Sequence, residues 1–263
     1  MKIIKYKNIF LSISTAVMVA SVLIIGVLGF NLGIDFTGGA LMEISYSEQP
    51  AKESLEERLN TMDLGGYSVR QTVDDAGRDG YILSTRDLTE AERQEVETIV
   101  TSVGSGAEVT RFTSIGPVIG EELKDKAVWA VGAVSIIIVL YVAFAFMGIG
   151  KPVSSWIYGG ITILSLLHDV LVPTALMSVL GYLVGIEVDV LFVMALLAVL
   201  GYSVNDTIVI FDRVRENLIK YRQEKKVQEK DAYGVEHEKI EYVFTKPFDQ
   251  IVDEAINQTL VRS

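Results

Sequence analysis

Four long stretches of apolar residues dominate the pattern along the chain. They cover residues 9–30, 127–149, 153–182 and 190–211. Each has the roughly 20 residues that a helix needs to cross about 30 Å of hydrocarbon. The pattern therefore predicts an α-helical membrane protein with four spanning helices, and it leaves one long polar insert between the first span and the second.

The polar insert, residues 32–126, has the alternation typical of a small folded domain. Four segments favour strands and two favour helices, in the order βαββαβ. Thr89 and Glu92 form a capping box that opens the second of these helices, which extends to Val103. This order predicts a ferredoxin-like α+β domain. The strands are expected at residues 40–46, 67–73, 81–85 and 107–113, and the first helix at 51–62.

The segment after the fourth apolar run divides into two parts. Residues 217–246 are highly charged, which indicates a solvated loop. Helical spacing of apolar residues returns from Phe248 to Leu260 and predicts an amphipathic helix. That helix either lies on the membrane surface or begins a further span.

Basic residues predict the orientation of the spans in the membrane. Lysines precede the first run, and Arg and Lys cluster after the fourth, whereas the connection at residues 181–189 has neither. We therefore expect the N-terminus and the tail in the cytoplasm and the insert outside. The first run exceeds a typical signal-peptide core and lacks a small-x-small cleavage site, which favours a retained helix.

Composition excludes several functions. The formal net charge is −11 and comes mostly from the insert, which argues against a nucleic-acid partner. The chain has no cysteine, so disulfides, thiolate metal sites and cysteine nucleophiles are excluded. No GxxxxGK[ST] motif, nucleophile–base arrangement or tight cluster of Asp, Glu and His appears. We expect neither an enzyme nor a metal site, and the acidic residues of the insert indicate a solvated face.

Ionisable residues inside two of the apolar runs are the strongest functional signal. His168 and Asp169 lie near the middle of the third run, and Asn205 and Asp206 lie towards the cytoplasmic end of the fourth. Such residues cost several kcal/mol and usually face a bundle interior or a water path. Asp206 is either a polar contact between helices, a cation or proton relay, or a substrate ligand. His168 is either a proton carrier or a hydrogen-bonding residue between helices, and Ser203 favours close helix packing.

Several motifs resemble those of the SecD/SecF family, the membrane accessory subunits of bacterial protein export. The sequence LGIDFTGG at residues 32–39 resembles the family signature after the first helix. SIGPVIGEELKDKA (114–127) and LLHDV (166–170) resemble the approach to the second helix and the third helix. GYSVNDTIVIFDRVREN (201–217) resembles the fourth helix in its SecF form, and AINQTLVRS (255–263) the start of a fifth. SecF ordinarily has six helices, so we expect a chain truncated before the last two.

The resemblance implies a mechanism and a set of partners. The implied function is to pair with SecD, assist the SecYEG channel and use the proton-motive force, without another cofactor, to move preproteins across the bacterial plasma membrane. Asp206 and Arg262 match the proton-coupling positions of the family, and the membrane bundle is expected to be RND-like. Asn205, Asp169 and His168 are implied to support them, and the signature after the first helix contains Gly33, Asp35, Gly38 and Gly39.

The expected organisation follows from the hydrophobic pattern and from the family resemblance together. It comprises a first helix (1–31), an external domain (32–126), helices two to four (127–211), a cytoplasmic loop (212–247) and the start of a fifth helix (248–263). A proton-coupled RND-type exporter of small molecules and a purely structural scaffold for SecD remain the alternative functions.

Overall fold

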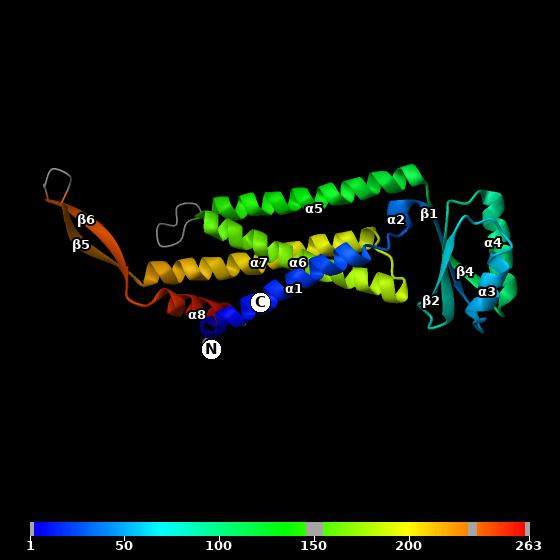
Figure 1. Cartoon of the computed structure of the whole chain (residues 1–263), viewed down its shortest axis with the longest axis horizontal. Coiled ribbons are helices and arrows are strands. Elements are labelled where there is room, and N and C mark those ends of the chain that lie inside the picture. The colour runs from blue at the N-terminus through cyan, green and yellow to red at the C-terminus, as the bar shows by residue number, and fades with distance from the viewer. Residues whose placement is uncertain (1–2, 146–154, 231–235, 261–263) are drawn as a thin grey trace. The chain divides into compact units, whose positions relative to one another are not determined.

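The computed structural model describes residues 3–145, 155–230 and 236–260. Within these ranges four helices are long and apolar enough to cross a membrane, as the apolar runs predict (Figure 1). Two of them extend furthest beyond the apolar runs, because polar residues continue the helix at one end. The four helices are α1 (Lys7–Leu28), α5 (Pro117–Ala145), α6 (Ser155–Val184) and α7 (Val190–Lys220).

The chain divides into two compact units, and each long helix contributes to both. One unit contains residues 24–133 and 174–196, which include the polar insert. The other contains residues 1–23, 134–173 and 197–263.

The polar insert forms a four-stranded antiparallel sheet in the order β2-β3-β1-β4. Helices α3 and α4 both lie on one face of this sheet (Figure 1). The strand order and the alternation of strands and helices confirm the predicted ferredoxin-like domain. Its elements are β1 (Gly39–Ser45), α3 (Lys52–Leu59), β2 (Tyr67–Val73), β3 (Asp79–Thr85), α4 (Glu90–Val103) and β4 (Glu108–Ile115).

The core of this sheet domain lies between the sheet and its two helices. Alternate residues of β1 and β3 point into it, and each fully buried aliphatic side chain contributes about 1.5–3 kcal/mol. Tyr46 is buried there and donates a hydrogen bond to the carbonyl of Val100 at 2.9 Å. Burial raises the pKa of Tyr46 to about 12. The side chains with the least exposure include Met42, Ile44, Leu55, Leu59, Leu83, Val96 and Val100.

The predicted capping box at the start of α4 is present. The Thr89 hydroxyl accepts a hydrogen bond from the Glu92 amide at 3.3 Å, and the Glu92 carboxylate accepts one from the Thr89 amide at 2.8 Å. The Arg86 side chain also donates to Glu92. These hydrogen bonds, with that from Arg86 the most important, lower the pKa of Glu92 to about 2.

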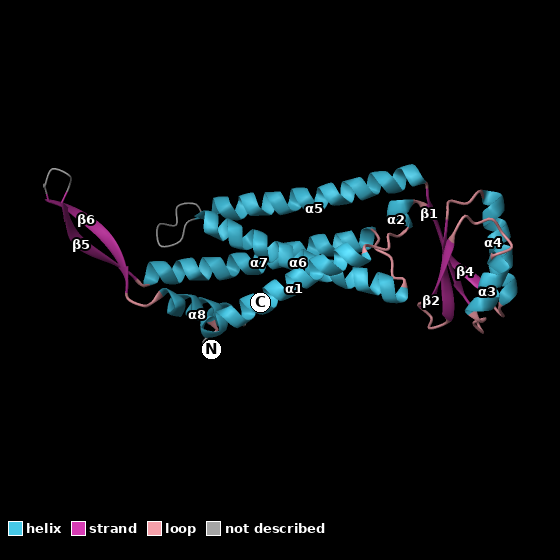
Figure 2. Cartoon of the chain, viewed as in Figure 1, coloured by secondary structure: helices cyan, strands magenta, loops and turns pink. Residues whose placement is uncertain are grey.

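Residues 222–230 and 236–244 form two paired antiparallel strands, so the prediction of a charged loop between 217 and 246 is wrong (Figure 2). Helix α7 first continues to Lys220, and the strands β5 (Arg222–Lys230) and β6 (Glu236–Phe244) follow. The register pairs positions of opposite charge, such as Lys225 with Glu241. Backbone pairing of β5 with β6 therefore orders a segment that looks like a solvated loop in the sequence.

The predicted amphipathic helix after this hairpin is α8 (Phe248–Thr259). Its apolar residues Ile251 and Ala255 are fully buried against Val214 and Leu218 of α7. The position of α8 against α7 therefore rests on its apolar stripe.

Gly39 begins β1 at a position that no other residue type fits. Its φ of +133° is one that L-residues rarely adopt, and a Cβ there would lie 2.4 Å from the carbonyl oxygen of Thr85. We expect Gly39→Ala to lower the free energy of opening of the sheet domain by more than about 2 kcal/mol. Hydrogen exchange of the β1 amides measures this. The control is Gly77→Ala, which has a φ of +78° but open space around the added Cβ; an equal loss in both variants would contradict the steric argument.

The lowered carboxyl pKa values predict acid sensitivity of the sheet domain. Hydrogen bonds from the Arg78 amide and side chain lower the pKa of Asp74 to about 2, as those at Glu92 do. The unfolded chain binds protons at these groups more readily than the folded one. The stabilisation is therefore complete above about pH 4.5 and is lost as the pH falls towards 2.

Glu92→Gln keeps the capping geometry but removes the titrating group. We expect its sheet domain to lose less stability between pH 4.5 and 2 than that of the parent chain, as measured by hydrogen exchange corrected for intrinsic rates. Identical pH dependence in the two chains would contradict the role of Glu92.

Candidate functional site

Asp169 lies near the middle of α6 and links this helix to α7. One carboxylate oxygen accepts a hydrogen bond from the hydroxyl of Ser203, and the other lies 3.0 Å from Nδ1 of His168. The Asp169 side chain is only 28% exposed. Three of the polar residues in the spans therefore form one connected cluster.

Pro173 adds a backbone group to this cluster. A helical carbonyl normally accepts the amide proton of the fourth residue after it, and proline has none. Pro173 lies within α6, four residues after Asp169. The main-chain carbonyl of Asp169 therefore lacks its helical donor and faces the same need for a polar partner as the side chain.

Asp206 follows Ser203 by three residues on α7, which places both on one face of the helix. It lies about 4.5 Å further along the axis, towards Lys220. Its side chain and that of Asn205 are exposed in this chain. In the described part of the chain no hydrogen bond or ion pair reaches the Asp206 carboxylate, so α6 and α7 alone leave this charge uncovered.

Arg262 lies outside the described residues, so its pairing with Asp206 stays a prediction. The structure does give the direction of α8, the helix that precedes Arg262. Glu254 accepts a hydrogen bond from Tyr221, and one turn later Gln258 accepts one from Asn217 at 3.2 Å. Helix α8 is therefore antiparallel to α7 and runs in the direction of Asp206.

The residues of the motif after the first helix hold the start of α7. Asp35 lies in the short helix α2 (Ile34–Thr37). Its carboxylate accepts a hydrogen bond from the Val190 amide at 2.9 Å, and Asp189 accepts one from the Phe192 amide at 2.8 Å. The Gly33 amide donates to the Val188 carbonyl at 2.8 Å. Two carboxylates thus satisfy free amides at the positive end of the helix that carries Asp206.

Gly38 allows the same segment to contact the start of α5. Its φ is +72°, and a Cβ would lie 2.6 Å from the Cα of Pro117. A Cβ on Gly120 would in turn lie 2.6 Å from the Gly38 amide nitrogen. The motif is therefore structural in this chain: its glycines allow close backbone contact, and its aspartate caps a helix.

Sequence reasoning missed two parts of this arrangement. Ser203 was assigned to packing, although a hydroxyl one turn before Asp206 could have suggested a hydrogen bond to a carboxylate. Pro173 follows Asp169 by four residues, and that spacing is itself a sequence signal for a freed carbonyl. Among residues 3–145, 155–230 and 236–260, no group of three or more His, Asp or Glu could hold a metal ion.

Comparisons with known proteins match the whole chain. A family model described as "Protein export membrane protein SecD/SecF, C-terminal" matches residues 95–232, and one described as "SecD/SecF GG Motif" matches residues 23–50. The protein translocase subunit SecF of Sebaldella termitidis is 33% identical over 100% of this chain and 75% of the relative. That of Thermobaculum terrenum is 32% identical over 99% of this chain and 77% of the relative.

A solved structure is also similar. The crystal structure of SecDF, a translocon-associated membrane protein from Thermus thermophilus, matches with a TM-score of 0.78 and 28% identity. The match covers 100% of this chain and 31% of that one, so this chain spans less than a third of the solved protein. From its four spanning helices, its ferredoxin-like insert and these similarities, the chain belongs to the SecD/SecF family of protein-export membrane proteins.

Proposed function

We propose that the chain is an accessory subunit of the Sec protein-export translocase. It acts with SecD beside the SecYEG channel and uses the proton-motive force to promote passage of preproteins across the bacterial plasma membrane. It performs no covalent chemistry and needs no cofactor besides the proton gradient. The names of its relatives, protein translocase subunit SecF, support this assignment.

The linked polar cluster in the spans is the observation that carries the proposal. Asp169 accepts a hydrogen bond from Ser203 between α6 and α7, and Asp206 lies one turn further along α7. Carboxylates at this depth are expensive and mark proton or ion pathways. A scaffold that only holds SecD in place has no need of them.

The proposed coupling depends on the charge of Asp206. The ionised carboxylate pairs with the cation of Arg262, and protonation removes that attraction. Asn205 supports the carboxylate, while Asp169 and His168 offer neighbouring proton positions. One proton that crosses 100 mV releases about 2.3 kcal/mol, which can bias a two-state equilibrium by more than tenfold.

The proposed orientation places the insert outside and the N-terminus in the cytoplasm. The Ile4 amide donates a hydrogen bond to Asp253 of α8 at 2.8 Å, and Lys7 lies 3.5 Å from Asp249. Residues 4 and 7 and the segment after α7 therefore lie together, which supports a common side of the membrane for both. The connection between α6 and α7 contacts the insert, which fits a common location for both outside.

Partner capture separates this proposal from a proton-coupled RND-type exporter of small molecules. Recovery of SecD and SecYEG with the tagged chain from detergent-solubilised membranes supports the export subunit. Recovery of an outer-membrane efflux partner in their place would overturn it.

Asp206→Asn removes the charge and keeps the shape of the side chain. We expect this variant to lose proton-dependent stimulation of preprotein translocation in membrane vesicles while it still assembles with SecD. Arg262→Met should have the same effect, because it removes the proposed cation. The matched control is Asp212→Asn, since Asp212 is exposed and lies 3.8 Å from Arg215 at the same end of α7. Normal stimulation in Asp206→Asn would disprove the relay.

The hydrogen bond between Asp169 and Ser203 predicts a graded loss. Asp169→Asn removes a charge, whereas Ser203→Ala removes one hydrogen bond to a charged group, which is equivalent to about tenfold in an equilibrium. We expect Ser203→Ala to slow proton-driven translocation about tenfold and Asp169→Asn to slow it further. Thr162→Ala provides a control, because the Thr162 hydroxyl donates to the carbonyl of Tyr158 within its own helix and not to another span. Full activity in both test variants would exclude this cluster from the mechanism.

A further inference from the structure

The connection between α6 and α7 contacts the sheet domain through one carboxylate. Glu187 lies 3.3 Å from a terminal guanidinium nitrogen of Arg70 on β2. The same carboxylate accepts hydrogen bonds from the hydroxyls of Ser84 at 3.3 Å and Ser68 at 3.5 Å. The side chains of Arg70 and Glu187 are only 21% and 11% exposed. All three partners of Glu187 belong to the sheet face that α3 and α4 leave uncovered.

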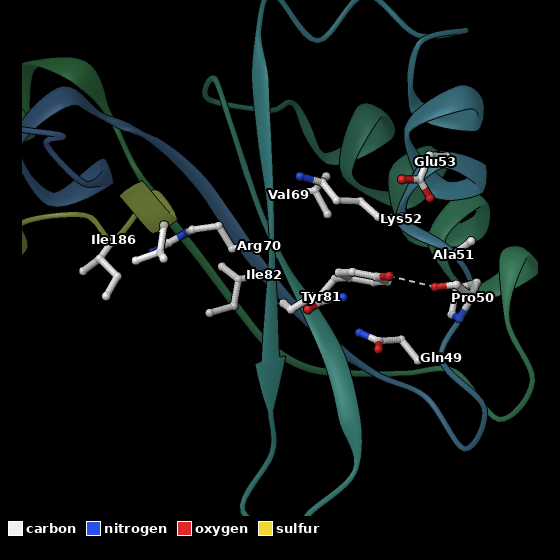
Figure 3. Close-up of a pocket in the computed structure, with 12 residues that line it drawn as sticks. Gln49, Pro50, Ala51, Lys52, Glu53, Val69, Arg70, Tyr81, Ile82 and Ile186 are labelled. Atoms are coloured by element: carbon white, nitrogen blue, oxygen red, sulfur yellow. Dashed lines mark hydrogen bonds between the residues drawn. The ribbon is translucent and has the colours of Figure 1, made fainter. Parts of the chain in front are cut away.

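Two hollows flank this contact. One of about 1040 Å³ extends around β2 and reaches Arg70, Ile82 and Ile186 (Figure 3). The other, of about 310 Å³, is lined in part by Ser68, Ser84 and Glu187. Figure 3 shows Arg70, Ile82 and Ile186 on one side of the strands and Lys52 and Glu53 on the other. Arg70 lines the first hollow and Glu187 lines the second, so the mostly buried ion pair has a hollow beside each of its partners.

The ion pair is incomplete. Arginine and carboxylate commonly form two parallel hydrogen bonds, whereas Glu187 approaches one terminal nitrogen of Arg70. The Nε of Arg70 is buried and has no acceptor among the residues that the structure describes. A buried donor without a partner is unfavourable. A small shift of the Glu187 carboxylate would satisfy it, so the contact has a second arrangement within reach.

Backbone bonds tie the connection firmly on its other side. The Val188 amide donates to the Asn31 carbonyl at 2.7 Å, and the Gly33 amide donates to the Val188 carbonyl at 2.8 Å. Gly185, at the end of α6, has a φ of +70°, a conformation that glycine adopts readily. Backbone hydrogen bonds thus hold the connection to the segment after α1, and the Glu187 side chain joins it to the sheet.

We propose that Glu187 and Arg70 are positioning residues that transmit movement of α6 and α7 to the sheet domain. The pair exchanges between the single contact described here and a bidentate contact that includes Nε. The inference rests on the proposed function, because it gives the proton-coupled spans, which carry Asp169 and Asp206, a mechanical connection to the domain outside the membrane. The two serine hydroxyls hold the carboxylate in both arrangements.

The test uses the full chain assembled with SecD in lipid vesicles. The chain has no cysteine, so spin labels can be attached at cysteines introduced for Val73 on β2 and Leu183 on α6, both exposed. Glu187→Gln should at least double the width of the distance distribution between the labels. It should also slow proton-driven translocation about tenfold, the scale of coupling between contacting residues. The exchange Arg70→Glu with Glu187→Arg should restore both, because it restores the attraction.

The matched control is the exchange of Glu43 and Arg111, an ion pair at 3.5 Å within the same sheet. It should leave both measurements at the values of the parent chain. Unchanged distances and rates in Glu187→Gln, or no recovery in the Arg70–Glu187 exchange, would overturn the proposal.

Asp206→Asn in the same vesicles distinguishes this proposal from the proposed function. If Asp206→Asn blocks proton-driven translocation while Glu187→Gln changes neither the label distances nor the translocation rate, only the mechanical connection is rejected. An active Asp206→Asn together with altered label distances in Glu187→Gln rejects the proton-coupled function and leaves the connection in place.

Discussion

Backbone pairing between the segment after α1 and the connection before α7 is the interaction on which the arrangement of the sheet-containing unit depends. Residues 31 and 33 exchange hydrogen bonds with Val188, and Asp35 caps the helix that follows. The amides at a helix start have no partner within the helix, and hydrocarbon offers none. The same few residues that satisfy them also begin the sheet, through the glycines that precede and open β1. The start of the fourth span and the start of the insert are consequently fixed together.

Within the spans it is the polar side chains that need partners, because the hydrocarbon around them contains no water. Asp169 finds its partners within the chain, since Ser203 and His168 satisfy its carboxylate. Asp206, which lies one turn after Ser203 on α7, is exposed on the described part of the bundle. The contrast between one satisfied and one uncovered carboxylate distinguishes a group that joins two helices from a group whose charge depends on what approaches it.

The features that could be predicted from the sequence are those that depend on residues close together along the chain. The capping box at Thr89, the apolar stripe of α8 and the four spans all depend on residues close in sequence, and each is present in the structure. The pairing of β5 with β6 was missed because it depends on backbone hydrogen bonds between the two strands, which the charged composition of the segment does not indicate. The contact between Arg70 and Glu187 depends on residues far apart in sequence, and no local period indicates it. The exposure of Asp206 depends on which helices surround α7, which composition does not specify.

The cap that Asp35 provides to α7 also has a consequence for synthesis. The two residues that share this hydrogen bond are 155 positions apart. The ribosome therefore releases the acceptor long before the donor, and the insert is complete by the time the fourth span emerges. The carboxylate that caps α7 is thus already synthesised when the amide that it accepts from is added to the chain.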